Sequence, residues 1–386
     1  MKNDQLLIAI ASDLHCTYGG QSSSKVSYLL SDLPKLPINR HPVESLKKII
    51  QAESIQADLL LCPGDISDKV DKQGLLSGWQ YLQEIKSALN ASSLISTLGN
   101  HDVDARNRHN SGPFDFIKNL IDYKPTENES ANDSFWRNSY CIVQTDEYLI
   151  LVLNSCSNHT NEEHAKLSQI HDSTLEKIEK ELKVITNTKL IRIAMCHHHP
   201  LHHSNISYQD SDFIDKSDRL LLLLGELEFS IVIHGHKHDP RLVKFNSLPV
   251  FACGSFSSMA NLLEVGAENT FHLISINTNT KKGVINTWIF QPINGWVQKH
   301  DAYFPSQTGF GFSNDVKDLA EDCSKWFSTS GKESIKYDSV IKQFPDICNL
   351  IPSQQKELNE LLFKKYELSF SPSLPNRPDR LFNMKQ

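Results

Sequence analysis

The chain has 386 residues, a length that suits one large domain or two smaller ones. Hydrophobic residues make up 39% of it and charged residues 22%, which is the composition of a water-soluble globular protein with a sizeable core. The net charge of −7 excludes a strongly basic protein, so a nucleic acid is a possible but not a favoured partner.

The eight cysteines are scattered along the chain without a Cys-x-x-Cys pair, and several lie inside apolar runs. This usage is typical of buried thiols in a reducing compartment and not of a disulfide framework. The apolar run near the start is too short for a signal peptide, and no stretch reaches the roughly 18 apolar residues of a membrane span. We therefore predict a cytoplasmic protein without a membrane partner.

Short apolar runs alternate with helical patterns in the first hundred residues. Strands are expected within residues 6–11, 58–65 and 93–102, and helices within residues 41–53 and 75–90. This alternation of strand and helix favours a mostly parallel sheet with helical crossovers.

The middle of the chain has a different texture. A hairpin is expected over residues 139–155, followed by a helix at residues 173–183 that opens with a capping box of Ser173 and Glu176. A buried helix at residues 217–225 is expected to end at Gly225. Five further strands are predicted within residues 189–196, 228–238, 249–255, 270–277 and 282–290, the last three of them antiparallel.

After about residue 299 the pattern changes to amphipathic helices, at residues 315–327 and 353–367, and an irregular proline-rich tail. We predict a first domain over residues 1–299 and a largely helical C-terminal extension over residues 300–386 whose role the sequence does not indicate.

Polar side chains that can bind metal ions follow five of the predicted strands, at the point where each strand ends. They are Asp13 and His15, Asp65, the stretch "NHD" (100–102), the stretch "HHHP" (197–200) and the stretch "HGHKH" (234–238). In open α/β sheets, ligands bind beyond the carboxyl ends of the strands. Glycines at positions 64, 99 and 235 would let the backbone approach such a site closely. The sequence therefore predicts one metal site assembled from five strand ends.

This set of motifs resembles the calcineurin-like metallophosphoesterases. The resemblance rests on "DLH" (13–15), "GD" (64–65), "GNHD" (99–102), the start of "HHHP" (197–200) and "GHKH" (235–238). It implies a four-layer α-β-β-α sandwich, an α/β fold in which two mixed sheets are packed between helices. It also implies a centre of two metal ions.

The family's pattern implies a ligand set for both ions. It assigns the first ion to Asp13, His15 and His238, the second ion to Asn100, His197 and His236, and the bridging position to Asp65. His198 remains an alternative to His197, because the histidine run can be aligned one residue later. Mixed carboxylate, imidazole and amide ligands suit Mn²⁺, Fe²⁺/³⁺ or Zn²⁺.

Two metal ions about 3.5–4 Å apart can clamp a phosphate and lower the pKa of a bridging water. We expect the resulting hydroxide to attack phosphorus in line. His101 is expected to stabilise the developing charge or to protonate the leaving oxygen, and Asp102 to orient the His101 ring.

Missing motifs narrow the branch of the family. The chain reads "GDISDKV" and "GNHD", unlike the Ser/Thr protein phosphatases, and Asp68 stands where purple acid phosphatases have a metal-binding tyrosine. The remaining pattern is most similar to the class III cyclic-nucleotide phosphodiesterases, which favours a small phosphodiester such as a cyclic or other nucleotide. The alternatives are a DNA nuclease similar to the double-strand-break repair exonucleases and a non-catalytic binding module with the same fold.

Specificity is expected in the loops beside the metal ions, at residues 16–41 and 103–116. Arg106, Arg108 and His109 in the second loop are candidates for contact with a phosphate or a base, and the alternative is that they are solvated loop charges. His199 is a further candidate for substrate contact.

Overall fold

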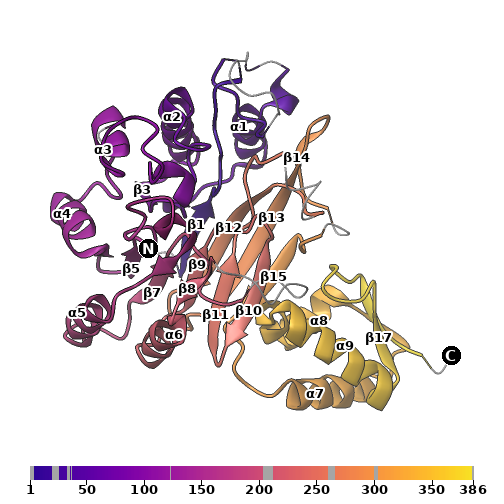
Figure 1. The fold of residues 1–386 in the computed structure, drawn as a ribbon. Helices are drawn as coiled ribbons and strands as arrows, with labels where there is room; N and C mark the ends of the chain where they lie inside the picture. The colour runs from indigo at the N-terminus through magenta and orange to yellow at the C-terminus, as the bar shows by residue number, and fades with distance from the viewer. Residues whose placement is uncertain are drawn as a thin grey trace.

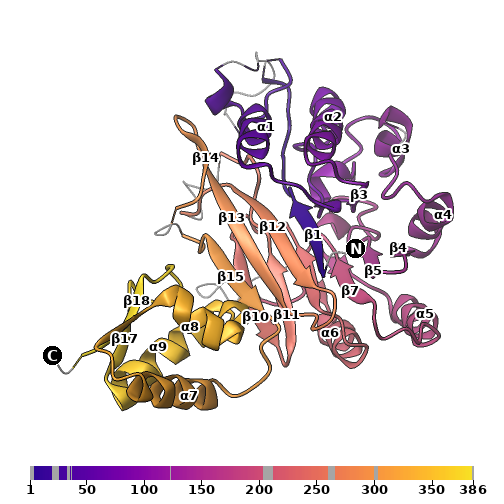
Figure 2. The same cartoon turned by 180° about the vertical axis from the view of Figure 1, so that it is seen from behind.

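Two β-sheets lie face to face, with helices on their outer faces and a small C-terminal module at one corner of the molecule (Figures 1 and 2). This computed structural model describes residues 4–19, 26–32, 35, 37–121, 123–202, 212–259, 266–299 and 303–384.

The first sheet has the strand order β14-β13-β12-β1-β2-β3, and β15 also pairs with β13. Its strands are β1 (Gln5–Ile10), β2 (Leu59–Cys62), β3 (Ser93–Ser96), β12 (Thr270–Asn277), β13 (Gly283–Gln291), β14 (Gly295–Val297) and β15 (Gln307–Phe310). As predicted, β1, β2 and β3 are parallel, and β12 and β13 are antiparallel neighbours. The sheet is therefore mixed.

The second sheet has the order β10-β11-β9-β7-β5-β4. Its strands are β4 (Tyr140–Gln144), β5 (Tyr148–Leu153), β7 (Ile191–Met195), β9 (Ile231–His234), β10 (Arg241–Phe245) and β11 (Leu248–Ala252). The predicted hairpin is confirmed as β4 and β5. The prediction that β11 forms one antiparallel run with β12 and β13 is wrong. Strand β11 belongs to the second sheet, where it runs parallel to β9 and antiparallel to β10, a strand that the sequence reading missed.

Helices cover the outer faces of both sheets (Figure 1). They are α1 (Pro42–Glu53), α2 (Lys72–Ala88), α3 (Asp115–Ile121), α4 (Glu129–Asn138), α5 (Asp172–Lys183) and α6 (Ser217–Glu226). Apolar residues of α1 and α2 pack with the first sheet, and those of α5 and α6 pack with the second. The four layers α-β-β-α confirm the predicted fold class.

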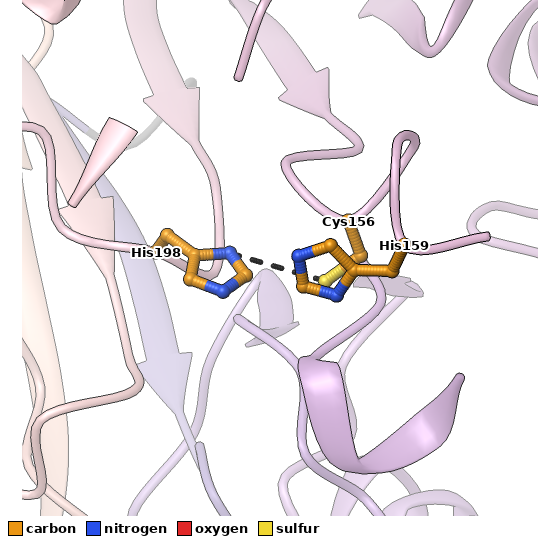
Figure 3. A group of neighbouring side chains, drawn as sticks. All are labelled: Cys156, His159 and His198. Carbon is orange, nitrogen blue, oxygen red and sulfur yellow. Dashed lines mark hydrogen bonds between the residues drawn. The ribbon is translucent and has the colours of Figure 1, made fainter. Parts of the chain in front are cut away.

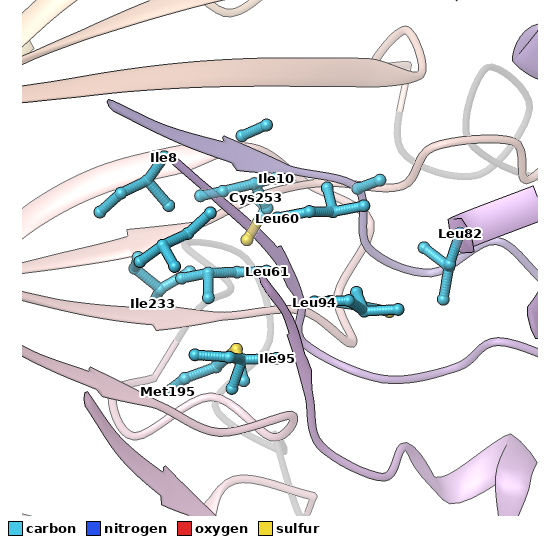
Figure 4. Close-up of a cluster of buried hydrophobic side chains, with 14 of the residues drawn as sticks. Ile8, Ile10, Leu60, Leu61, Leu82, Leu94, Ile95, Met195, Ile233 and Cys253 are labelled. Carbon is cyan, nitrogen blue, oxygen red and sulfur yellow. The ribbon is translucent and has the colours of Figure 1, made fainter. Parts of the chain in front are cut away.

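The core between the sheets follows from the alternation of side chains along each strand. In β5, Ile150 and Val152 join the inter-sheet core, whereas Leu149, Leu151 and Leu153 join the cluster beneath α5 and α6. Both faces of this strand are covered, which explains its continuous apolar sequence. Figure 4 shows part of the inter-sheet core, where Met195 and Ile233 of the second sheet lie near Ile95 and Leu61 of the first.

Two predicted helix ends are wrong. Helix α5 begins at Asp172 with His171 at the N-cap and without a side-chain cap, so Ser173 and Glu176 of the predicted box both lie within the helix. Gly225 lies within α6, because the Leu227 N–H still donates to the Leu223 carbonyl. In both cases burial of the apolar helix face, and not the capping residue, sets where the helix lies.

The C-terminal module has a hydrophobic core of its own, built from residues between Phe312 and Leu381. Its elements are α7 (Val316–Thr329), β16 (Ser334–Lys336), α8 (Tyr337–Gln343), the 3₁₀ helix η6 (Pro345–Asn349), α9 (Pro352–Tyr366), β17 (Leu368–Ser371) and β18 (Arg380–Asn383). The two predicted helices are confirmed as α7 and α9. The prediction of an irregular tail is wrong at β18, which pairs with both β16 and β17.

The module is anchored where β1 begins and not where it ends. Gly309 N–H donates to the Leu350 carbonyl (3.2 Å), the Asn349 side chain donates to the Gly283 carbonyl (3.3 Å), and Lys282 pairs with Asp346. Gly283 opens β13, and the neighbouring Asn277 pairs with Gln5, the first residue of β1. The module therefore contacts the end of the first sheet where β1 begins. This contact lies about one strand length, roughly 20 Å, from the end where β1 finishes.

Residues 300–302, where the domain boundary was predicted, lie outside the described residues, and so does part of the predicted loop at residues 16–41. Within the described part of the chain, no helix is long and apolar enough to span a bilayer.

Candidate metal centre

The side chains expected to hold the first ion converge where β1, β2 and β9 end. His238 Nε2 lies 2.7 Å from His15 Nε2 and 3.5 Å from Asp13 Oδ1, and His15 Nε2 lies 3.6 Å from Asp65 Oδ2. Their potential ligand atoms all lie within 4.8 Å of one another. Two imidazoles and two carboxylates around one point fit a divalent cation.

The side chains expected to hold the second ion form an adjacent group. Asn100 Oδ1 lies 3.0 Å from His197 Nε2 and 2.9 Å from His236 Nδ1. His197 Nε2 is also 3.4 Å from Asp65 Oδ2. Asp65 therefore belongs to both groups, which is the position that a bridging carboxylate must have.

The geometry favours His197 over its alternative, His198, as the ligand of the second ion. His197 Nδ1 lies 2.8 Å from the Pro63 carbonyl, so Nδ1 carries the proton and the Nε2 lone pair faces Asp65 and Asn100. The His198 ring packs beside that of His236 at 4.5 Å, but its Nδ1 lies 2.9 Å from Ser155 Oγ and not against Asp65 or Asn100.

The backbone at the site is strained. Five of the seven expected ligands have left-handed backbone angles: Asp13 (φ 53°), His15 (46°), Asp65 (52°), His236 (76°) and His238 (54°). Each costs on the order of 1–3 kcal/mol and persists only when the surroundings enforce it. The neighbouring loops do so here, for example through the hydrogen bond from Asp13 N–H to the Gly64 carbonyl (3.0 Å). Such strain is concentrated at functional sites in proteins, which supports a role for these residues.

Glycines make room for the centre, as predicted. A Cβ added to Gly99 would overlap the carboxylate and backbone of Asp65, and one added to Gly235 would overlap the Asp13 carboxylate. The loops after β2 and β3 can therefore meet only because Gly99 lacks a side chain.

Burial makes the histidines of the centre ready to bind cations. It lowers the pKa of His15 to about 4 and that of His197 well below its ordinary value, so both rings are neutral at pH 7. For Asp65, burial together with the charges of Asp13 and Asp102 raises the carboxyl pKa well above its ordinary value. Bound cations would offset this repulsion, so the donor set fits metal ions.

His101 stands at the rim of the centre, and its ring is held by a residue that the sequence reading did not assign to the site. His101 Nδ1 lies 2.9 Å from Asp68 Oδ1, and the His101 N–H donates to Asp65 Oδ1 (2.8 Å). Burial lowers the pKa of His101, but the charges of Asp65 and Asp68 outweigh it, so the pKa is raised. The available signal was the position of Asp68, three residues after Asp65 in the same loop.

A family model described as calcineurin-like phosphoesterase matches residues 6–240, which is more than half of the chain. The chain belongs to the calcineurin-like phosphoesterase family. This family uses centres of two metal ions, and membership together with the His and Asp groups supports metal-dependent hydrolysis of a phosphoester. A second model, wHTH-Calcineurin_assc, matches residues 308–363.

The similar solved structures show the fold alone, because sequence identity to them is low. The purple acid phosphatase from yellow lupin (Lupinus luteus) seeds is 12% identical with a TM-score of 0.51, over 79% of this chain and 53% of that chain. This chain thus spans about half the length of the lupin protein. A dimetal phosphatase from Danio rerio is 10% identical with a TM-score of 0.48, over 73% and 95%. No curated protein matches the chain.

In this calcineurin-like phosphoesterase, Asp102 does not orient His101, and that prediction is corrected. The buried Asp102 carboxylate accepts hydrogen bonds from the backbone N–H groups of Ile66 (3.2 Å), Ser67 (2.9 Å) and Gly99 (3.1 Å). These bonds hold the loop after β2 against the loop after β3. Asp102 therefore shapes the loops that carry Asp65 and Asn100, while Asp68 takes the orienting role.

Two of the predicted substrate residues line a cavity beside the phosphoesterase centre. Arg106 and Arg108 line a cavity of about 200 Å³ together with Asn100 and His101. Arg106 is exposed and lies 3.4 Å from Glu162, and Arg108 donates to the Lys69 carbonyl (3.1 Å). Both guanidinium groups therefore stand at the approach to the centre.

The other two substrate candidates have mainly structural contacts. His109 Nε2 lies 2.8 Å from the Val70 carbonyl and its ring stacks on Phe116 with a centroid distance of 4.5 Å. His199 is buried, with its ring nearly parallel to that of His236 at 5.7 Å. Their contact with a substrate stays a prediction.

Asp212 is a second residue that the sequence reading missed. Its carboxylate lies 2.8 Å from His236 Nε2 and 2.8 Å from Lys237 Nζ. This contact fixes the His236 ring so that Nδ1 faces Asn100. Nothing in the local sequence around Asp212 indicated this role, because the contact joins residues 24 positions apart.

Proposed function

We propose that the chain hydrolyses a phosphodiester, most readily a cyclic or other nucleotide, with two divalent metal ions. The observation that carries this proposal is the place of Asp65, whose carboxylate lies between one group of Asp13, His15 and His238 and a second group of Asn100, His197 and His236. These seven side chains would hold the ions. Bound there, the ions supply an activated water and neutralise charge on the phosphoryl group.

The chain's own residues supply the remaining chemistry. His101 stands at the rim with a raised pKa, so its protonated ring can donate a proton to the leaving oxygen. Asp68 holds that ring through Nδ1 and leaves Nε2 for the substrate. An alkyl leaving group, such as the ribose oxygen of a nucleotide ester, needs this proton far more than an acidic phenol does.

The substrate class is supported by the cavity beside His101. Arg106 and Arg108 bring positive charge to its lining, which suits the phosphate of a small nucleotide substrate. The ligand set has no sulfur and combines carboxylate, imidazole and amide, so Mn²⁺, Fe²⁺/³⁺ and Zn²⁺ are the proposed ions.

The DNA nuclease alternative is favoured by one observation, the match of residues 308–363 to the model wHTH-Calcineurin_assc. Helix-turn-helix modules place a helix in the major groove of DNA. However, the exposed face of α9 carries acidic as well as basic residues. The module is also anchored at the end of the first sheet that lies away from the metal centre. We therefore keep the small phosphodiester as the leading proposal. The non-catalytic alternative has less support because the chain keeps all seven residues of the family's ligand pattern.

A panel of substrates tests the proposal. Protein loaded with Mn²⁺ is assayed on cyclic mononucleotides, linear dinucleotides, DNA ends, and simple phosphate mono- and diesters. The proposal expects turnover of nucleotide diesters above that of monoesters, whereas degradation of DNA ends with little turnover of small diesters would establish the nuclease alternative.

We also propose a cytoplasmic location, since all eight cysteines are free thiols and seven of them are buried. Cell fractionation tests this proposal, and recovery outside the cytoplasm would refute it.

A further inference from the structure

A third cluster of potential ligands lies beside the metal centre, formed by Cys156, His159 and His198. Cys156 and His159 follow β5, and His198 follows β7. The three side chains are buried, with exposed fractions of 0%, 0% and 2%. Figure 3 shows the two imidazole rings next to each other, with the Cys156 sulfur beside them; the ring planes are 77° apart and the centroids 5.1 Å apart. Their potential ligand atoms all lie within 4.8 Å of one another.

His159 is the member of the cluster that indicates a ligand. Neither of its ring nitrogens has a hydrogen-bond partner among the described residues, although the ring is fully buried. The Leu167 carbonyl in the same loop accepts a hydrogen bond from the Asn158 side chain (2.8 Å). A buried polar group without a partner costs about 1–3 kcal/mol, and such groups are rare in folded proteins. A cation would satisfy the lone pair of this ring.

The other two members can supply the remaining ligands. His198 Nδ1 lies 3.9 Å from Cys156 Sγ and 2.9 Å from Ser155 Oγ, and the Cys156 thiol donates to the Leu98 carbonyl (3.4 Å). Tetrahedral ligands at about 2.0–2.3 Å from Zn²⁺ are roughly 3.5 Å apart. The observed separations therefore need only a small inward rotation of the side chains.

We propose that Cys156, His159 and His198 form a third cation site, selective for a thiophilic divalent ion such as Zn²⁺. The Ser155 hydroxyl borders the cluster, with Oγ 2.9 Å from His198 Nδ1. Thiolate and imidazole ligands select Zn²⁺ over oxygen-preferring ions, whereas the dinuclear centre has no sulfur.

The protonation states fit this assignment. Burial lowers the pKa of His159 to about 4, so its ring presents a neutral nitrogen. Burial raises the pKa of the Cys156 thiol well above its ordinary value. Binding therefore exchanges the thiol proton for the cation, with one proton released per ion bound.

The site would fasten the loop after β5 to the loop after β7. His198 follows His197 directly, and its ring lies 4.5 Å from that of His236. A cation here would fix the backbone that delivers His197, an expected ligand of the dinuclear centre. Cys156, His159 and His198 do not line the cavity beside His101, so the proposed ion has a structural role.

Absorption of the full chain loaded with Co²⁺ tests the proposal, because only a sulfur ligand gives an intense thiolate-to-cobalt charge-transfer band in the near ultraviolet. We expect the band in the wild type, its loss in Cys156→Ser, and its retention in Cys141→Ser, a control cysteine that is equally buried in β4. Mass spectrometry of bound metal should count three ions per chain in the wild type and two in Cys156→Ser.

Asp65→Asn separates this proposal from the proposed function. It should keep the charge-transfer band while the dinuclear centre is impaired. A wild-type protein without the band, or a band that survives in Cys156→Ser, would overturn the third site. Both measurements require folded protein. If Cys156→Ser folds poorly, the presence or absence of the band in the wild-type spectrum decides whether the third site exists.

Discussion

The Asp68 carboxylate holds the ring of His101, the proposed proton donor. It lies 2.9 Å from His101 Nδ1 and 3.6 Å from His15 Nδ1, so one half-buried carboxylate contacts both the proposed proton donor and an expected ligand. Asp102, the next residue after His101, instead bonds the loop backbone. At the scale of residues, the Asp68 carboxylate therefore contacts the His101 ring, and the Asp102 carboxylate holds the loop backbone.

His101→Ala should reduce turnover of diesters with alkyl leaving groups by about 10²–10⁴-fold, the usual contribution of a general acid. Esters of p-nitrophenol should lose far less, because that leaving group needs little protonation. Steady-state rates on matched alkyl and p-nitrophenyl diesters measure the difference. Equal losses on both would show that His101 stabilises charge without donating a proton.

Asp68→Asn should change the pH dependence of the same reaction. His101 acts as an acid only while protonated, so the rate falls as the pH rises through its pKa. Asp68 raises that pKa, so its loss should move the alkaline fall in kcat to lower pH. Asp102→Asn is the control: it should lower the melting temperature but leave the profile in place, and a profile shifted by Asp102→Asn alone would reverse the two assignments.

The loops that directly follow the strands contain the strained backbone angles and the close contacts of the site. Gly99 and Gly225 form a matched pair for testing this. A Cβ at Gly99 would overlap Asp65, whereas a Cβ at Gly225, inside α6, meets nothing within 4 Å.

Gly99→Ala should lower metal occupancy and activity, because the loops after β2 and β3 must separate. Gly225→Ala should stabilise the fold by about 0.4–1 kcal/mol, since alanine loses less chain entropy in a helix. Metal content and melting temperature of both variants measure this. Normal occupancy in Gly99→Ala would show that the close approach is dispensable.

The elements of the site could be predicted from the sequence because strand ends are marked by apolar runs that stop at polar residues. Asp13, Asp65 and His197 all follow such runs, and the structure brings them together. Asp68 and Asp212 could not be found in this way, because their contacts join loops whose approach depends on the tertiary fold. Strands β10 and β18 were missed because their sequences are short and mixed, and their pairing partners lie elsewhere in the chain.

At the scale of the molecule, the two mixed sheets follow from the alternation of apolar runs and from the family resemblance. The place of the C-terminal module does not, because it depends on contacts of Gly283 and Gly309 that no local pattern marks. We propose that the module is a separate folding unit, anchored at the sheet edge away from the metal centre. Strand β15, which lies just before the module in the chain, still belongs to the first sheet.

Two truncations test this division. A chain that ends at Gly311 keeps β15 and should stay folded and bind metal, because the module has its own core. A chain that ends at residue 299 also loses the buried Phe310, which packs on Gly283, and should be less stable. Thermal unfolding and metal content of both proteins provide the comparison. Aggregation of the longer truncation would show that the module completes the core of the phosphoesterase.

We propose that Asp65 and six side chains around it hold two ions that make the chain a phosphodiesterase. Chelated protein should be inactive on bis(p-nitrophenyl) phosphate, and titration with Mn²⁺ should restore turnover with the binding of two ions per chain at this centre. Asp65→Asn, titrated in the same way, should stay at least about 100-fold slower, because several kcal/mol of transition-state stabilisation are lost. Full activity after chelation, or near-wild-type turnover of Mn²⁺-loaded Asp65→Asn, would contradict the account.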